Sequence, residues 1–130
     1  MITFELALPP RELSPNVRTH PWNLIRHKRI YRHACKVDSL NVRRGYETVM
    51  TFPLPPPVQM HLTFVVTTKR RRDLDNLIAS MKSGIDGIVD AGLIRDDSAD
   101  DLSITADVEL GEGPCVVVTL LSRPAQEEAL

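Results

Sequence analysis

The chain has 130 residues and a formal net charge of −1, a length that favours one domain with a substantial core. It has no apolar run near the roughly 18 residues of a membrane-spanning helix. Its first residues lack the basic segment and apolar core of a secretory signal. The two cysteines, Cys35 and Cys115, have no paired spacing. We therefore expect free thiols in a cytoplasmic protein with no membrane partner.

Charge is distributed unevenly along the chain. Residues 11–72 contain 13 Arg or Lys side chains against 3 acids, whereas residues 73–130 contain 3 against 13. The first half therefore predicts a positive surface that the net charge conceals. A protein that only binds nucleic acid gains nothing from carboxylates near phosphate, whereas a metal enzyme needs them to hold its cation. This pattern favours a nucleic-acid enzyme over a simple binding protein.

The N-terminal segment predicts a strand followed by a loop. Apolar residues alternate with other residues over positions 2–8, which is typical of a half-buried strand, and two prolines end it. Residues 11–20 carry turn-forming side chains. Within this loop, Asn16 and Arg18 are either phosphate ligands or ordinary residues of a surface turn.

A basic helix is predicted over residues 21–37, capped by Thr19 or His20 and with a proline in its first turn. Apolar residues recur near helical spacing, and no acid occurs between Glu12 and Asp38. The helix contributes four candidate phosphate contacts: Arg26, Lys28, Arg29 and Arg32. They either face a phosphate backbone, because such cations give sequence-independent DNA affinity, or form a solvated surface.

The middle of the chain gives a weak pattern and then a strong one. Residues 38–51 are ambiguous, and the proline-rich residues 52–57 form a stiff linker. Residues 58–67 alternate clearly and predict a strand. Four consecutive cations follow the strand: Lys69, Arg70, Arg71 and Arg72. Like charges repel, so this block indicates an anionic partner.

Two aspartates follow the cations. Asp73 and Asp75 lie one residue apart, a spacing that points both carboxylates to one side of an extended segment. A helix is predicted over residues 75–90. Asp75 is its candidate N-cap, whereas Asp73 has no comparable structural role. Gly84 and Gly87 weaken the helix but permit close packing.

The C-terminal part predicts two further strands. Residues 102–110 alternate again, residues 111–114 form a turn, and residues 115–121 are continuously apolar. We predict two antiparallel strands, the second well buried, and a loose polar tail over residues 122–130. The order β-α-β-α-β-β over residues 1–130 predicts a single α/β domain of the α+β type, with helices packed against a mixed sheet.

A second acidic pair, Asp96-Asp97, follows the predicted helix and its turn. If the fold brings this pair beside Asp73 and Asp75, several carboxylates converge next to a cationic segment. Mg²⁺ takes carboxylate and phosphate oxygens as ligands, and carboxylates on separate elements can hold one or two metals for phosphodiester hydrolysis. The acidic pattern therefore predicts a divalent-metal site.

Three polar side chains near these aspartates have competing interpretations. Lys82 lies about two helical turns beyond Asp75 and either steadies a phosphate or departing oxyanion or forms a surface ion pair with Asp86. Asn76 either orients a ligand or caps the helix. The sequence leaves each pair of alternatives open.

Several short motifs occur together in this chain. Its C-terminal half contains Arg70-Arg71-Arg72-Asp73-Leu74-Asp75-Asn76-Leu77, then Lys82, Asp86, Ala91-Gly92-Leu93 and Asp96-Asp97-Ser98. Its N-terminal half contains Leu8-Pro9-Pro10, Ser14-Pro15-Asn16 and a basic segment with Lys28, Tyr31 and Arg32. This combination closely resembles the RusA-type Holliday junction resolvases, which are small bacterial and prophage endonucleases, over most of the chain.

The resemblance implies a Mg²⁺-dependent homodimer, with Mn²⁺ able to substitute, that resolves four-way DNA junctions by paired nicks in recombination and repair. It implies catalytic, metal-binding acids at Asp73, Asp75 and Asp97, and it places the essential lysine at Lys82. The residues expected to support this site are Asn76, Asp86 and Asp96. No nucleotide cofactor is expected. The alternatives are a metal-dependent nuclease for flaps or branched replication intermediates and a non-enzymatic DNA-binding module.

Overall fold

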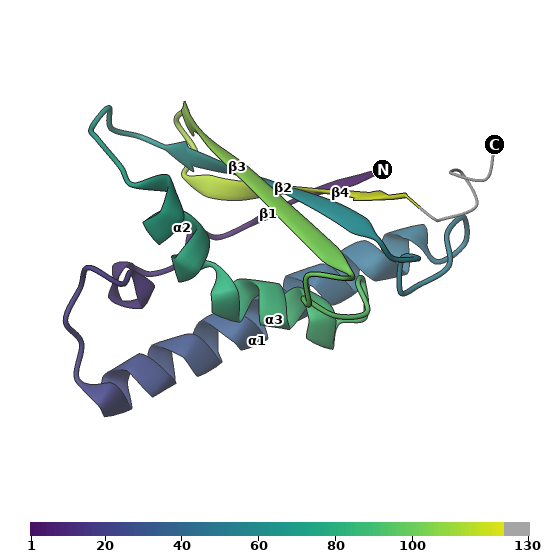
Figure 1. Ribbon diagram of the computed structural model, residues 1–130, viewed down its shortest axis with the longest axis horizontal. Coiled ribbons are helices and arrows are strands. Elements are labelled where there is room, and N and C mark those ends of the chain that lie inside the picture. The colour runs from purple at the N-terminus through teal and green to yellow at the C-terminus, as the bar shows by residue number, and fades with distance from the viewer. Residues whose placement is uncertain (124–130) are drawn as a thin grey trace.

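The computed structural model describes residues 1–123, so most of the predicted tail lies outside the described residues. The described chain forms one mixed α+β domain, which confirms the predicted fold class (Figure 1). Its elements are β1 (Ile2–Leu6), the short 3-10 helix η1 (Arg11–Leu13), α1 (Pro21–Tyr46), β2 (Val58–Val66), α2 (Leu74–Ser80), α3 (Lys82–Asp90), β3 (Leu102–Leu110) and β4 (Cys115–Ser122).

The four strands form one sheet in the order β1-β4-β2-β3. β2 pairs in parallel with β3, from Val58 opposite Leu102 to Val66 opposite Leu110. β4 is antiparallel to both β1 and β2. The predicted mixed sheet is therefore confirmed, and Ser122, which the sequence places in the tail, instead ends β4.

The last two strands run in opposite directions, as predicted, but they are not neighbours in the sheet, because β2 lies between them. Their connection passes the end of β2, where the Gly111 N–H donates to the Val66 carbonyl at 2.9 Å. Burial explains the order. β4 ends its buried valine series with fully buried Leu120 and takes an interior position, whereas β3 lies at the edge and ends in exposed Leu110.

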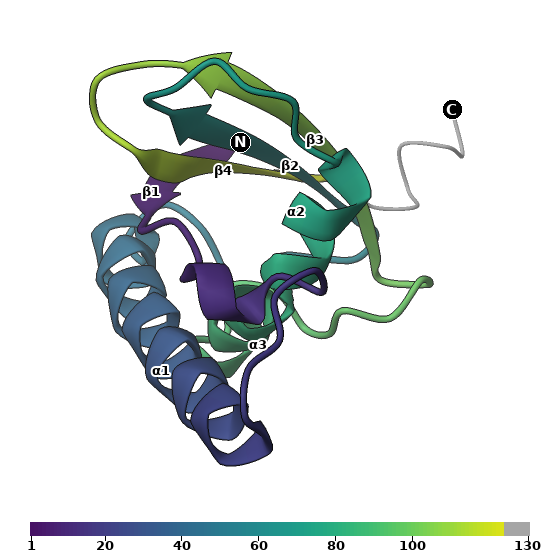
Figure 2. The ribbon, with the colours of Figure 1, turned by 90° about the vertical axis from the view of Figure 1, so that its left-hand side faces the viewer.

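The described helices α1, α2 and α3 all lie on one side of the sheet (Figures 1 and 2). The residues of β2 on the covered side are all buried: Val58, Met60, Leu62, Phe64 and Val66. His61 and Thr63 on the other side are half-buried. The apolar residues that alternate in this stretch of the sequence therefore lie on the covered face of the sheet, and the residues between them lie on the open face.

Helix α1 extends through Tyr46, well beyond its predicted end. Its buried stripe is narrow, because Tyr31 and Cys35 are surrounded in sequence by charged residues. His20 is the N-cap, as one of the two predicted alternatives, since its Nδ1 accepts a hydrogen bond from the Trp22 N–H at 3.3 Å. Although α1 is long, neither it nor another helix within residues 1–123 has the length and apolarity to cross a membrane.

Helices α1 and α3 approach closely through two glycines. A Cβ atom on Gly87 would lie 2.5 Å from the Arg32 carbonyl oxygen, and one on Gly84 would lie 2.9 Å from the Tyr31 ring. Both distances are shorter than real Cβ contacts allow. The predicted role of these glycines in close packing is confirmed.

The helix predicted over residues 75–90 is broken at Met81, which separates α2 from α3. The Met81 N–H donates to the Ile78 carbonyl at 3.0 Å, three residues back rather than four. The Ser80 hydroxyl donates to the Leu77 carbonyl at 2.6 Å and competes for a helical acceptor. The fully buried Met81 side chain anchors the break in the core.

Candidate nucleic-acid interface

A cavity lies between the N-terminal loop and the segment that leads into α2. Residues 8–17 form one wall and residues 70–80 form another, with part of β2 beneath. Figure 2 shows the loop that carries η1 beside α2. We call this the strip cavity. It brings together predicted residues that lie far apart in the sequence: Asn16, Arg70, Arg71, Arg72, Asp73 and Asn76.

The cations Lys69 to Arg72, here called the basic strip, do not all have the same role. The Arg72 guanidinium donates to the Thr68 carbonyl at 2.8 Å, to the Thr68 hydroxyl at 3.0 Å and to the Arg70 carbonyl at 3.2 Å. Arg72 therefore fixes the turn of the strip. Lys69, Arg70 and Arg71 are exposed. Arg70 and Arg71 also line the strip cavity, so their charges are available to an anion that enters it.

Asp73 is the N-cap of α2, and the prediction that Asp75 has this role is wrong. The Asp73 Oδ1 atom accepts a hydrogen bond from the Asp75 N–H at 2.9 Å, and its backbone is extended as an N-cap requires. Asp75 lies exposed in the first helical turn. The residue that the sequence left without a structural role therefore has one.

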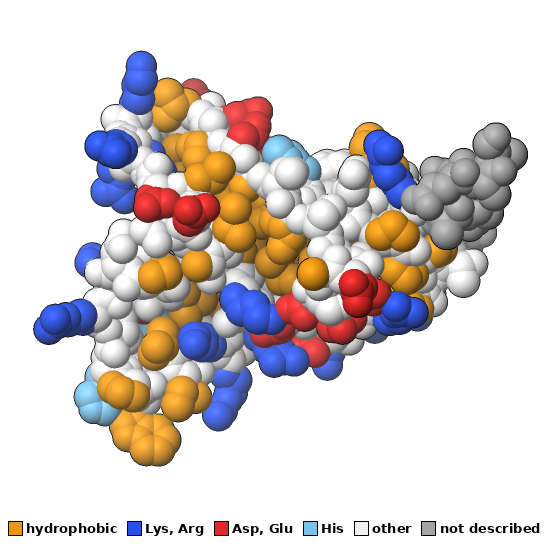
Figure 3. Space-filling view, viewed as in Figure 1, with side chains coloured by type: hydrophobic (Ala, Val, Ile, Leu, Met, Phe, Trp, Pro, Cys, Tyr) orange, Lys and Arg blue, Asp and Glu red, His pale blue; other side chains and the backbone are white. Residues whose placement is uncertain are grey.

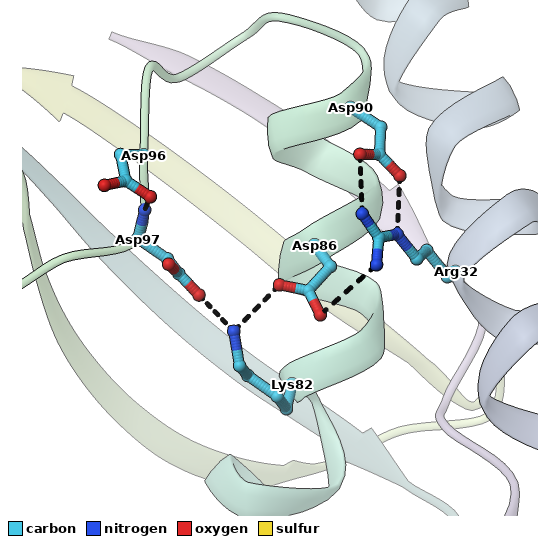
Figure 4. Close-up of polar contacts among 6 residues, drawn as sticks. All are labelled: Arg32, Lys82, Asp86, Asp90, Asp96 and Asp97. Carbon is cyan, nitrogen blue, oxygen red and sulfur yellow. Dashed lines mark hydrogen bonds and ion pairs between the residues drawn. The ribbon is translucent and has the colours of Figure 1, made fainter. Parts of the chain in front are cut away.

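Lys82 joins two carboxylates from different segments (Figure 4). Its Nζ donates to Asp86 Oδ1 at 2.8 Å, one turn further along α3, and also to Asp97 Oδ2. Both contacts raise the pKa of Lys82, and the hydrogen bond to Asp86 has the larger effect. The Lys82 ammonium in turn lowers the pKa of Asp97. The predicted Lys82–Asp86 ion pair exists, and Asp97 is a second partner that the sequence spacing did not indicate.

Arg32, a predicted phosphate contact, connects α1 to α3 instead. Its Nε and Nη2 atoms donate to the two oxygens of Asp90 at 2.6 and 2.9 Å, and its Nη1 lies 3.9 Å from Asp86 Oδ2 (Figure 4). This geometry lowers the pKa of Asp90, mainly through the hydrogen bonds from Arg32. Two acids therefore already compensate the charge of Arg32.

A second cavity adjoins the strip cavity. Lys28, Lys82 and Asp86 line it, and both cavities share Ser14, Val17 and Ser80 as lining residues. The lining of a third, shallow hollow contains Arg18, together with His20, Asn23 and His27 at the start of α1. Arg26 and Arg29 are exposed on α1. The predicted cations thus form a surface that extends from the basic strip around the N-terminal loop to α1.

The candidate metal ligands do not converge in this arrangement. In Figure 3 the acidic side chains where α2 begins are separate from those beside α3. Asp73 and Asp75 belong to the start of α2, whereas Asp97 pairs with Lys82. Within residues 1–123, no group of three or more His, Cys, Asp or Glu side chains is placed to hold a metal ion. The donor types suit Mg²⁺, but their present positions do not fit it.

One ion pair near the site was not found from the sequence. The Arg95 guanidinium donates through Nε and Nη2 to both oxygens of Asp101 at 2.8 and 2.7 Å, and the Asp101 side chain is 8% exposed. Arg95 lowers the pKa of Asp101. The pair closes the loop that carries Asp96 and Asp97. The two residues lie outside the helices and strands, where neither helical nor strand periodicity applies, so their separation of six residues gives no recognisable signal.

No family model matches the chain. A protein of Xylella fastidiosa (strain Temecula1 / ATCC 700964), described as an uncharacterized protein, is 30% identical to it over 91 residues. The matched region covers 70% of this chain and 58% of that relative. The chain therefore spans less than two thirds of the relative's length, and the similarity carries no statement about activity.

Proposed function

We propose that this protein is a RusA-type endodeoxyribonuclease that nicks four-way DNA junctions with Mg²⁺ or Mn²⁺ as cofactor. The observation that best supports the proposal is the strip cavity, which places Asn16 opposite a segment that carries Arg70, Arg71 and two aspartates. Basic side chains around a hollow suit a phosphate backbone. Carboxylates beside such a hollow suit hydrolysis rather than binding alone.

The cationic surface gives this proposal its substrate class. Arg70 and Arg71 line the strip cavity, Lys28 lines the adjoining one, and Arg26 and Arg29 continue the charge along α1. Phosphate contacts position a protein on DNA without reading sequence. A junction that bends between its arms then supplies shape selectivity. We therefore propose branched DNA, in a bacterial or phage-infected cytoplasm, as the substrate.

A shared Mg²⁺ ion requires the candidate ligands to move. Asp73, Asp75 and Asp97 would have to come closer together to share a metal, because Asp73 caps α2 and Asp97 pairs with Lys82. A cation that draws Asp97 toward α2 has to replace this ion pair. When bound, the metal would supply an activated water and charge stabilisation at the leaving oxygen.

A homodimer is part of the same proposal. Strand β3 is nine residues long and lies at the edge of the sheet, and Val108 and Leu110 on it are exposed. Such an edge is available for pairing with another chain. A twofold dimer would present two sites to a junction with matching symmetry, which suits paired nicks.

A DNA-binding module without catalysis is the second candidate. The observation that favours it is that Asp73 and Asp97 already have structural partners, an N-cap bond and an ion pair. In that case the aspartates stabilise the fold and the cations alone bind DNA. This candidate shares the cationic surface but predicts no metal-dependent chemistry.

The deciding experiment measures nicking of an immobile four-way junction by wild type and by Asp75→Asn, with Mg²⁺, Mn²⁺ or EDTA. The proposal predicts paired, metal-dependent nicks that disappear in the variant while junction binding remains. Asp107→Asn, on the open face of the sheet, is the matched control and should cleave normally. Equal cleavage of flaps or plain duplex would reassign the substrate. If the protein binds the junction but cleaves it with neither Mg²⁺ nor Mn²⁺, the result would support the DNA-binding module without catalysis.

A further inference from the structure

The start of α1 presents an exposed aromatic side chain on a basic surface. Trp22 is the one tryptophan in the chain, its exposed fraction is 75%, and that of Ile25 on the next turn is 49%. Figure 3 shows hydrophobic side chains at the end of the molecule where α1 begins, beside His and Lys or Arg side chains. Large apolar groups exposed together are characteristic of interaction sites.

The charges around Trp22 favour an anionic partner. Arg26 lies one helical turn beyond Trp22, and Arg29 lies one turn beyond Ile25, so these pairs share faces of the helix. Both arginines are exposed. The shallow hollow at the same end also has Arg18 in its lining. An aromatic ring among cations suits a ligand with a flat ring and a phosphate.

The same end of α1 is continuous with the proposed DNA surface. Arg11 and Val17 line both the strip cavity and the shallow hollow that contains His20 and Asn23. A strand that lies in the strip cavity can therefore pass around the N-terminal loop to the hollow at His20 and Asn23, which flank Trp22 in the sequence.

We infer that Trp22 is a stacking platform for an unpaired base of branched DNA, with Arg26 and Arg29 on the flanking phosphates. This inference rests on the proposed nucleic-acid function but concerns recognition, not cleavage. Every base offers a flat face to an aromatic ring, so stacking does not depend on sequence. Bases in a plain duplex are already stacked, whereas a branch point or single strand offers free ones. Trp22 therefore discriminates branched DNA from duplex.

A basic helix with an exposed tryptophan also suits an anionic membrane surface. Exposed apolar side chains also occur further along α1, at Ile30 and Val37, with exposed fractions of 57% and 42%. The observation that favours DNA is the course of the cationic surface. It continues into the strip cavity, which lies around the N-terminal loop rather than along one flat side of α1.

The test uses the fluorescence of Trp22, which reports this position alone because the chain has one tryptophan. The protein is titrated in EDTA with an immobile junction, with its component duplex and with single-stranded DNA, while the anisotropy of labelled DNA reports binding. We expect quenching by the junction and the single strand but not by the duplex. Trp22→Ala should weaken junction binding by about tenfold and duplex binding much less, and Trp22→Phe should restore part of the loss.

Val49→Ala is the matched control, because Val49 is 76% exposed just beyond the other end of α1. It should leave both affinities unchanged. Junction binding without quenching, or an unchanged affinity in Trp22→Ala, would overturn the inference while leaving cleavage intact. Quenching without any nicking would support the platform and count against the nuclease. A fluorescence blue shift with phosphatidylserine vesicles but no response to DNA would replace the inference with membrane binding.

Discussion

The Asp73 carboxylate caps the helix that begins beside Asp75, through a hydrogen bond of 2.9 Å from the Asp75 N–H. This hydrogen bond joins two of the proposed metal ligands, so a change at Asp73 also affects the backbone position of Asp75. A substitution at Asp73 can remove both the helix cap and the negative charge, and the two effects require different variants.

Asp73→Asn should keep the fold and lose the proposed activity. Asparagine caps helices about as well as aspartate, whereas alanine at an N-cap costs about 0.5–2 kcal/mol. Urea denaturation should therefore show a stability close to wild type for Asp73→Asn and a loss in that range for Asp73→Ala. In the nicking assay both variants should be inactive. An active Asp73→Asn protein would remove Asp73 from the proposed chemistry and leave its cap.

Lys82→Met tests whether the lysine serves chemistry or stability. The Lys82 side chain is 63% exposed, so the loss of its ion pairs should change the free energy of unfolding by about 0.5 kcal/mol or less. Under the nuclease proposal, nicking should fall by about 10²-fold or more, with junction binding largely kept. Lys36→Met on α1 is the control. A variant that nicks at the wild-type rate would limit Lys82 to its surface ion pairs.

Arg95→Met should loosen the loop that carries Asp96 and Asp97 without removing either carboxylate. Both guanidinium contacts to Asp101 disappear in this variant, and Asp101 is left as a shielded carboxylate without its cation. Amide hydrogen exchange over residues 96–101 should therefore accelerate, while exchange in α1 stays slow. The prediction fails if protection in this loop is unaffected.

Gly87→Ala should strongly destabilise the domain. Its Cβ would lie 2.5 Å from the Arg32 carbonyl oxygen and 2.9 Å from the Lys36 nitrogen, both backbone atoms that cannot turn aside. We expect a loss of about 3 kcal/mol or more. Gly45→Ala on α1 is the control, because no atom lies within 4 Å of its Cβ position. This substitution should increase the free energy of unfolding by up to about 1 kcal/mol. Thermal denaturation of the three proteins measures both effects.

The Arg32–Asp90 ion pair should make stability depend on pH in acid. The folded-state pKa of Asp90 lies below its ordinary value of 3.8 because of Arg32. Its contribution is therefore present above that value and is lost as the pH falls through the lowered pKa. Asp90→Asn should show a shallower decline in unfolding free energy in this window than wild type. Parallel pH profiles for the two proteins would contradict the assignment.

Local patterns were sufficient for most of the elements. Alternation identified three of the four strands, and the continuous apolar run over residues 115–121 identified the fourth. The paired glycines in α3 correctly indicated a close helix contact. The basic helix was recognised but shortened, since its buried stripe is narrow and charged residues separate its members. The break at Met81 was missed, because apolar spacing continues through it and the cause is a local hydrogen bond from Ser80.

Local sequence patterns were enough to predict the α+β class, the covered face of three strands and the concentration of cations before the first aspartates. Tertiary structure decided which strands are neighbours, since the greater burial of β4 places β2 between it and β3. It also decided that Asp73 serves as a cap, that Asp97 pairs with Lys82 and that Arg32 pairs with Asp90. These partners come from separate segments or from cap geometry. A charge in a sequence indicates what it can bind, but its actual partner depends on which backbone lies within a few ångströms.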